Sequence, residues 1–195
     1  MKILDYGSGD GYLSYTLKKI NKDLTVHATD YLFEDNDFYK NINFFTIEDI
    51  FSNNQKYNLI ILRHVLEHIE DPFEIINQLL KKLESGGCIL VEVPNHDLTS
   101  NKLLIFGKDY SQVGLPWHFN HFVKNDFLLN LPNRRIVFSK NSIPVLGQSL
   151  LMKVFPKKIF FENTGILALV FYPFQVIFDL VTFSYTALVV KIYKD

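Results

Sequence analysis

A short apolar strand that runs into a glycine loop is the pattern that most constrains the fold of this chain. The strand Lys2–Tyr6 is followed by Gly7, Gly9 and Gly11 at alternate positions, and a helical pattern begins near Tyr12. Glycine permits φ angles and a close backbone approach that a Cβ atom would block. A strand, a glycine loop and a helix in this order are typical of the first unit of an α/β sheet that binds a ligand at its carboxyl edge.

The spacing of the glycines indicates which ligand the loop suits. Loops that bind a nicotinamide dinucleotide have the spacing GxGxxG, in which the third glycine lets the helix pack closely beneath a pyrophosphate. This loop has the spacing GxGxG, and Asp5 places a carboxylate on the strand just before it. Both features favour a ligand without phosphate groups.

Strand-like and helix-like segments alternate through the first half of the chain, which indicates βαβ units and a parallel sheet. Asp71 and Pro72 predict the N-cap and first turn of a helix that Gly86 and Gly87 end. The strands predicted after the first are Leu24–Thr29, Ile42–Ile47, Tyr57–Leu62 and Cys88–Val93.

The second half completes the predicted sheet within one domain, residues 1–195. A helix is predicted at Asn125–Leu131 and a sixth strand at Arg134–Ser139. The β-branched run Tyr185–Tyr193 predicts a last strand beside the sixth, after an apolar insert at 143–184. The predicted fold is α/β, a Rossmann-like open sheet of seven mostly parallel strands, with helices on both faces and the last strand antiparallel.

Acidic residues at the predicted strand ends favour a nucleoside ligand. Asp30 follows the second strand, where a carboxylate accepts hydrogen bonds from both hydroxyls of a ribose. Asp49 and Ile50 follow the third strand, where an adenine ring would lie. Glycines also occur in plain turns, but the two strand-end acids make a purely structural role for the loop the weaker interpretation.

Several segments together resemble the class I S-adenosylmethionine-dependent methyltransferases. They are Leu4–Gly11, Asp30, His64–Pro72 and Leu83–Gly87. The resemblance covers residues 2–127, and it is nearest to the subgroup of ubiquinone-pathway O-methyltransferases and small enzymes of natural-product and cell-surface sugar pathways.

The resemblance implies S-adenosylmethionine as cofactor and a role for each matching residue. The glycine loop would wrap the methionine end, and Asp5 would steady the loop and the amino group. Asp30 would hold the ribose, and Arg63 and His64 would border the methionine and its methyl group. The full set of implied cofactor-binding residues is Asp5, Tyr6, Gly7, Ser8, Gly9, Asp10, Gly11, Asp30, Tyr31, Asp49, Ile50, Arg63 and His64.

One departure from the family pattern concerns the N-terminus. Family members normally carry a helix before the first strand that helps to close the cofactor site, whereas here the glycine loop begins six residues after Met1. We therefore expect this lid helix to be missing. A truncated, non-catalytic module that binds the cofactor or a partner is the alternative to an enzyme.

Histidines on loops expected at the carboxyl edge are the candidates for catalysis. Methyl transfer to a hydroxyl needs a base, and histidine is the usual base near neutral pH. His118 is the first candidate, and His64 and His68 are the others. Alternatively, His118 is a hydrogen-bonded structural histidine or one that packs against Trp117.

A divalent metal held by Glu67 and His68 with His118 or His121 is the other chemical hypothesis. The adjacent pair Glu67 and His68 does not place two ligands on one helix face, as an i, i+4 pair would. We therefore expect no metal site.

Composition limits the partners and the location. Twenty lysines and arginines stand against 21 acids, so no basic field favours nucleic acid. The lone Cys88 and the absence of a signal-peptide pattern predict a cytoplasmic protein. The apolar segment 165–183 is expected to be a buried or lid helix, with a homodimer surface or a peripheral membrane contact as alternatives. Pro173 and Asp179 disfavour a membrane span.

The predicted function is transfer of a methyl group from S-adenosylmethionine to a small-molecule or glycan-type acceptor, most readily at oxygen. A nicotinamide-dependent oxidoreductase is the rival enzyme class, and the glycine spacing disfavours it.

Overall fold

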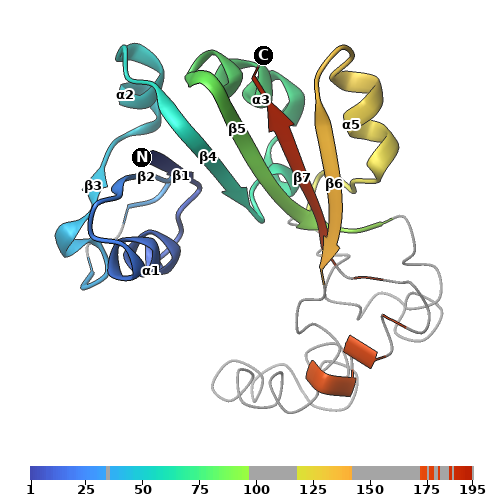
Figure 1. Cartoon of the computed structure of the whole chain (residues 1–195), viewed down its shortest axis with the longest axis horizontal. Coiled ribbons are helices and arrows are strands. Elements are labelled where there is room, and N and C mark those ends of the chain that lie inside the picture. Colours follow the sequence, from blue (N-terminus) through green and yellow to red (C-terminus); the bar gives the residue numbers. More distant parts are fainter. Residues whose placement is uncertain are drawn as a thin grey trace.

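The computed structural model describes residues 1–33, 36–96, 118–141, 172–174, 176–177, 180, 185 and 187–194. The described strands form one seven-stranded sheet in the order β3-β2-β1-β4-β5-β7-β6 (Figure 1). Their bounds are β1 Lys2–Tyr6, β2 Thr25–Thr29, β3 Asn43–Phe44, β4 Tyr57–Arg63, β5 Leu83–Pro94, β6 Ile136–Asn141 and β7 Ala187–Tyr193.

The direction of the strands confirms the predicted fold class. β1 pairs in parallel with β2 and with β4, and β2–β3 and β4–β5 are also parallel. The last strand, β7, lies between β5 and β6 and is antiparallel to both. Because the chain leaves β1 toward β2 and β3 and then returns to β4 on the other side, the strand order reverses between β1 and β4. Ligands of open α/β sheets bind at the carboxyl ends of the strands at such a reversal.

Helices connect the strands, and two of them begin at well-formed caps. The helices are α1 Tyr12–Ile20, α2 Ile47–Ser52, α3 Pro72–Lys81 and α5 Lys124–Asn130, with the short 3₁₀ helices η1 Tyr39–Asn41 and η2 Leu66–His68. The Asp71 side chain accepts a hydrogen bond of 3.2 Å from Glu74 N, which confirms the predicted cap of α3.

The third strand is shorter than predicted because a helix cap competes for its last residues. Thr46 and Asp49 form a capping box, in which each side chain accepts a hydrogen bond from the other residue's backbone N–H. α2 therefore begins at Ile47, and the expectation of a strand over residues 42–47 was wrong at its end.

The fifth strand begins earlier than predicted. α3 ends at Lys81, and β5 already pairs with β4 at Leu83. The register then shifts, because Tyr57 is opposite Leu83 whereas Leu59 is opposite Cys88. Gly86, with φ of +73°, lies in this irregular stretch. The glycine pair was expected to end the helix, and instead it lets the backbone of β5 bend beside β4.

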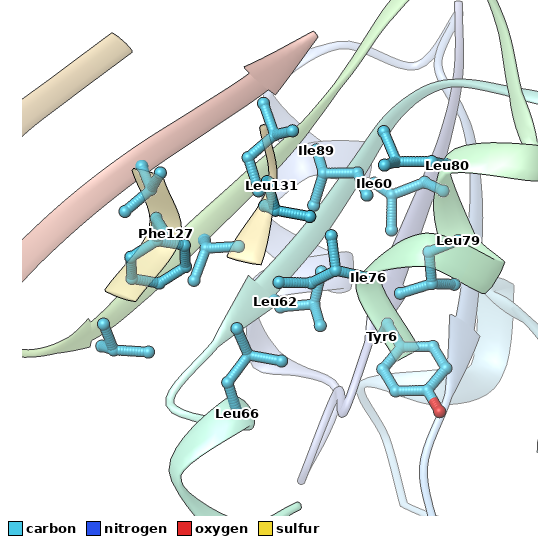
Figure 2. Close-up of a cluster of buried hydrophobic side chains, with 14 of the residues drawn as sticks. Tyr6, Ile60, Leu62, Leu66, Ile76, Leu79, Leu80, Ile89, Phe127 and Leu131 are labelled. Atoms are coloured by element: carbon cyan, nitrogen blue, oxygen red, sulfur yellow. The ribbon is translucent and has the colours of Figure 1, made fainter. Parts of the chain in front are cut away.

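Apolar side chains cover both faces of the sheet. Leu4 belongs to the larger core, which α3 and α5 cover, and Figure 2 shows Ile76 of α3 near Leu62 of β4. The opposite face of the first strands carries a smaller cluster of Val26, Ala28, Tyr39 and Ile42, against which Leu17 of α1 packs. Helices therefore lie on both faces, as expected.

The apolar insert at 143–184 lies almost wholly outside the described residues. A buried or lid helix, a homodimer surface and a peripheral membrane contact at 165–183 therefore stay predictions. Within the part of the chain that the structure does describe, no helix combines the length and the apolar character that crossing a bilayer requires.

The core makes a first prediction about stability. Leu79 is fully buried in α3, whereas Leu129 in α5 is 78% exposed. Replacing Leu79 by alanine leaves a cavity and should lower the free energy of unfolding by about 2–5 kcal/mol. The same replacement at Leu129 should change it by less than about 0.5 kcal/mol. Urea denaturation of both variants measures the difference, and equal losses would contradict the packing described for α3.

Candidate active site

A cavity of about 680 Å³ lies at the carboxyl ends of β1 and β4, where the strand order reverses. Its volume is within the range of sites that bind small molecules and cofactors. The lining residues come from β1 and the glycine loop, the end of β2, the start of α2 and the segment after β4. They are Asp5, Tyr6, Gly7, Ser8, Gly9, Asp10, Tyr12, Leu13, Thr29, Asp30, Tyr31, Ile47, Arg63, His64, Val65, His68 and Ile69.

The three loop glycines all have positive φ, but the space beside them differs. A Cβ atom on Gly7 would lie 2.3 Å from Val65 Cγ2, and one on Gly11 would lie 2.8 Å from the ring of Tyr39. At Gly9, with φ of +57°, no described atom would lie within 4 Å of a Cβ. Gly7 and Gly11 are thus required by packing within the protein, while Gly9 leaves bare backbone beside the cavity.

Hydrogen bonds to the next strand and to η1 hold the loop in place. Thr29 O accepts bonds of 2.8 Å from Gly7 N and 3.0 Å from Ser8 N. Tyr39 OH donates to Gly9 O at 2.7 Å and lies 2.8 Å from Ser8 Oγ. Tyr39 was not predicted from the sequence, because an aromatic residue in a short connecting helix carries no local pattern that marks it as a loop brace.

Asp5 stands at the inner wall of the cavity and is almost fully buried. Its Oδ2 accepts a hydrogen bond of 2.7 Å from Ser14 Oγ in α1. Burial raises the pKa of Asp5 above its ordinary value, and the hydrogen bonds from Ser14 lower it in part. The carboxylate therefore ties β1 to α1 directly behind the loop. Tyr6 also lines the cavity, although its ring packs edge-on against Phe51 in the core.

Asp30 lies at the rim of the cavity, as predicted. Its Oδ2 accepts a bond of 2.7 Å from Gly9 N, and its Oδ1 accepts one of 3.2 Å from Leu32 N. Each carboxylate oxygen can accept a second hydrogen bond. The next residue, Tyr31, lines the same rim and is 88% exposed.

Asp49 and Ile50 are not among the residues that line the cavity, and their contact with an adenine ring stays a prediction. The Asp49 carboxylate is occupied in the capping box of α2. Ile50 is fully buried in the core. Both predictions depended on a longer third strand. Ile47, the first residue of α2, lines the cavity instead.

A chain of charged side chains follows β4 along the cavity wall. His64 Nδ1 lies 3.3 Å from Glu67 Oε1, and His64 Nε2 lies 3.4 Å from Glu92 Oε1. Arg63 Nε donates to the same Glu92 oxygen at 3.1 Å. His64 has φ of +55°, a strained backbone that points to a functional constraint.

Both ring nitrogens of His64 face carboxylates, so the imidazolium form satisfies the arrangement best. Burial alone would lower the pKa of His64, but the hydrogen bonds and charges of Glu67 and Glu92 outweigh it and raise the pKa to about 9. The same contact with His64, with Arg63 nearby, lowers the pKa of Glu92. His64 is therefore a cation at neutral pH and cannot accept a proton.

A second cluster, formed by Glu67, His68 and His118, lies next to these charged side chains. A carboxylate oxygen of Glu67 and one ring nitrogen each of His68 and His118 all lie within 4.8 Å of one another. Glu67 O accepts hydrogen bonds from Phe119 N at 2.8 Å and Asn120 N at 3.2 Å, which bring residues 118–120 against η2. The structure brings these three side chains together although Glu67 and His68 are adjacent in the sequence, and the expectation that no metal binds here stays a prediction.

The remaining predicted residues lie apart from this cluster or outside the described part of the chain. His121 packs against His96, with ring centroids 4.4 Å apart. Trp117, the expected partner of His118, lies outside the described residues. The structure therefore brings His64, His68 and His118 together around Glu67, and His64 and His68 also line the cavity.

Comparisons with known proteins agree with this architecture. A family model described as a methyltransferase domain matches residues 1–134. The ubiquinone biosynthesis O-methyltransferase of Actinobacillus pleuropneumoniae serotype 7 (strain AP76) is 30% identical over 145 residues, which are 66% of this chain and 62% of that protein. The mitochondrial enzyme of the same name from Dictyostelium discoideum is 25% identical over 146 residues, 64% of this chain and 46% of that protein. The chain thus spans less than two thirds of either relative.

Solved structures show the same fold. The plantazolicin methyltransferase BpumL, in complex with a triazolic desmethylPZN analog and S-adenosylhomocysteine (SAH), superposes with a TM-score of 0.62 at 18% identity, over 100% of this chain and 77% of that one. Phosphoethanolamine N-methyltransferase 2 of Haemonchus contortus gives a TM-score of 0.61 at 13% identity, over 100% and 48% of the two chains. Because the family model matches more than half of the 195 residues, the chain belongs to the class I S-adenosylmethionine-dependent methyltransferase family, as its motifs predicted.

Proposed function

We propose that this chain binds S-adenosylmethionine in the cavity and transfers its methyl group to a hydroxyl group of a small-molecule acceptor. The observation that carries the proposal is the bare backbone at Gly9 beside a carboxylate, Asp30, whose oxygens retain acceptor capacity. A nucleoside with a short amino-acid tail matches this combination. A diphosphate does not, because Asp30 and Asp10 would place negative charge against it.

The residues at the cavity fit the parts of this cofactor. Asp30 would hold the ribose hydroxyls, and Gly9 would allow the methionine part to approach the loop. Ile47 and Tyr31 offer apolar contact for adenine in place of Asp49 and Ile50. Arg63 and His64 supply positive charge for the cofactor's carboxylate.

The mechanism of methyl transfer determines which tasks the protein itself must perform. When bound, S-adenosylmethionine supplies a sulfonium methyl group, which is transferred as the acceptor oxygen forms the C–O bond, the C–S bond breaks and its electron pair stays on sulfur. The protein has to align the acceptor and to remove its hydroxyl proton. Because the raised pKa keeps His64 protonated, we withdraw it as a candidate base. We assign the removal of the hydroxyl proton to the site formed by His68 and His118.

Oxygen is the acceptor atom that the relatives favour, because their names specify O-methylation in ubiquinone biosynthesis. A glycan-type acceptor with a free hydroxyl would undergo the same chemistry. The cytoplasmic location stays a prediction from sequence, as does a membrane or dimer contact through 165–183.

The first test of this proposal is cofactor binding. Wild-type protein should bind SAH in a calorimetric titration and should not bind NAD. Replacing Asp30 by alanine should weaken SAH binding by at least about tenfold, because charge-assisted hydrogen bonds to the ribose are lost. Asp37→Ala is the control, since Asp37 lies on the surface and pairs with Lys40. A preference for NAD, or an unchanged SAH affinity of Asp30→Ala, would reject the cofactor assignment.

Alanine substitutions at two glycines with positive φ, Gly9 and Gly86, distinguish an effect on cofactor binding from an effect on stability. Gly9 and Gly86 both have positive φ, and at both positions an added Cβ would have no described atom within 4 Å, but only Gly9 lines the cavity. Alanine at either position should lower the free energy of unfolding by about 1–2 kcal/mol. Only Gly9→Ala should also weaken SAH binding, as measured by the same titration. Equal affinities of the two variants would show that the backbone at Gly9 does not meet the cofactor.

The raised pKa of His64 makes a prediction about stability and pH. Its pKa is about 9 in the folded protein against about 6.5 unfolded, so its stabilising effect is complete below pH 6.5 and is lost as pH rises through 9. Asparagine tolerates positive φ and removes the charge. The difference in unfolding free energy between wild type and His64→Asn should therefore shrink between pH 6.5 and 10. Urea denaturation in EDTA measures it, with the exposed His121→Asn as control, and a constant difference would disprove the charged state.

A further inference from the structure

We propose that the outer edge of β6 binds an extended acidic segment of a partner protein, which adds to the sheet as a further strand. β6 is the last strand in the sheet order, and Figure 1 shows it at the border of the sheet. It has six residues, whereas β3 at the opposite border has only two. A very short edge strand offers few backbone groups to a partner. β6 is therefore the border of the sheet that can accept a strand.

The pairing of β6 with β7 determines which backbone groups of β6 point outward. Tyr193 N donates to Arg135 O at 3.0 Å, and these two residues lie opposite each other in the continued register of the two strands. The backbone groups of Arg135 therefore face β7. Because this direction alternates along a strand, the N–H and C=O groups of Ile136, Phe138 and Lys140 face away from β7. Within the part of the chain that the structure describes, these outward groups have no hydrogen-bond partner.

The charge around this edge indicates which partner it suits. Lys140 of β6, Lys191 of β7 and Arg135 just before β6 are all exposed. Among the described residues, none of these three cations takes part in an ion pair. Neither β6 nor β7 contains an acidic residue. The edge would therefore attract a strand that carries carboxylates and repel a strand that carries lysines or arginines.

The cations lie on both faces of β6, with an apolar contact between them. Residues opposite each other on paired strands share a face, so Val137 lies beside Lys191. Arg135 lies on this same face, where its guanidinium carbon is 3.7 Å from the centroid of the Tyr193 ring. Lys140 lies on the other face. Val137 is 48% exposed, and an apolar side chain of an added strand would cover it while neighbouring acids meet the cations.

A second copy of this chain is the rival occupant of the edge. Two β6 strands paired with each other would bring the cations of both copies into one interface, and lysines on edge strands discourage such self-association. The same cations favour an acidic partner, so the edge discriminates between the two. None of the residues at this edge lines the cofactor cavity, so the partner site is separate from it.

A designed peptide tests the proposal with the whole chain. The probe is a fluorescent peptide of alternating glutamate and valine that is long enough to span β6, and its anisotropy is measured as protein is added. Wild-type protein should bind it. A peptide with lysine in place of glutamate, or one with N-methylated backbone amides, should not bind. Equal binding of all three peptides, or binding of none, overturns the proposal.

Two substitutions at Lys140 separate charge from backbone pairing. Lys140→Gln removes the charge and should weaken peptide binding by about two- to fivefold. Lys140→Pro also removes an N–H that faces away from β7, so the sheet should stay intact while binding weakens by about tenfold or more. Lys40→Gln is the control, because Lys40 pairs with Asp37 on the surface and lies in η1, outside β6. Equal affinities of the two Lys140 variants would show that the peptide does not pair with β6.

The remaining outcomes identify a different occupant. Circular dichroism and SAH titration should give the same result for wild type and both Lys140 variants, because the edge lies apart from the cavity. A dimer in sedimentation experiments that Lys140→Pro dissociates would assign the edge to a second copy and overturn the proposal. Phosphatidylserine vesicles that displace the peptide, and that bind Lys140→Gln and Lys140→Pro equally, would assign the surface to an anionic membrane and also overturn it.

Discussion

The anchoring of the glycine loop to the end of β2 is the interaction that shapes every other part of the site. Two successive backbone N–H groups, of Gly7 and Ser8, donate to one carbonyl oxygen, Thr29 O. The neighbouring carboxylate of Asp30 accepts from Gly9 N. These bonds satisfy the backbone of a tight loop whose glycines could otherwise adopt many conformations. They also hold the loop at the carboxyl end of β1, where Gly7, Ser8 and Gly9 line the cavity.

The opposite wall of the cavity depends on charge. His64 contacts carboxylates on η2 and on β5, so the segment after β4 is linked both to the next helix and to the next strand. Glu67 takes part through two different groups, with its side chain facing His64 and its carbonyl holding residues 118–120. One residue thereby connects the cofactor wall with the segment that carries His118. A change at this position would disturb the geometry of both.

Local patterns predicted most of the fold and part of the site. The five parallel strands and α3 could be found because alternation, apolar runs and the Asp71 cap are properties of neighbouring residues. The errors occurred where two local signals competed. The Thr46 and Asp49 capping box ended the third strand early, and Asp49 and Ile50 are not among the residues that line the cavity. The register shift beside Gly86 extended the fifth strand over residues that the glycine pair had seemed to exclude.

Neighbouring residues in the chain were enough to specify the glycine loop, the acid at Asp30 and the order of strands and helices, because each depends on residues that are adjacent or one helical turn apart. The folded arrangement was needed to establish that Tyr39 braces the loop, that both ring nitrogens of His64 face carboxylates, and that Glu67 and His68 meet His118. These contacts join elements that come together only in the packed fold. Their distances are set by the packing of helices on the sheet, and no periodicity in the chain encodes that packing.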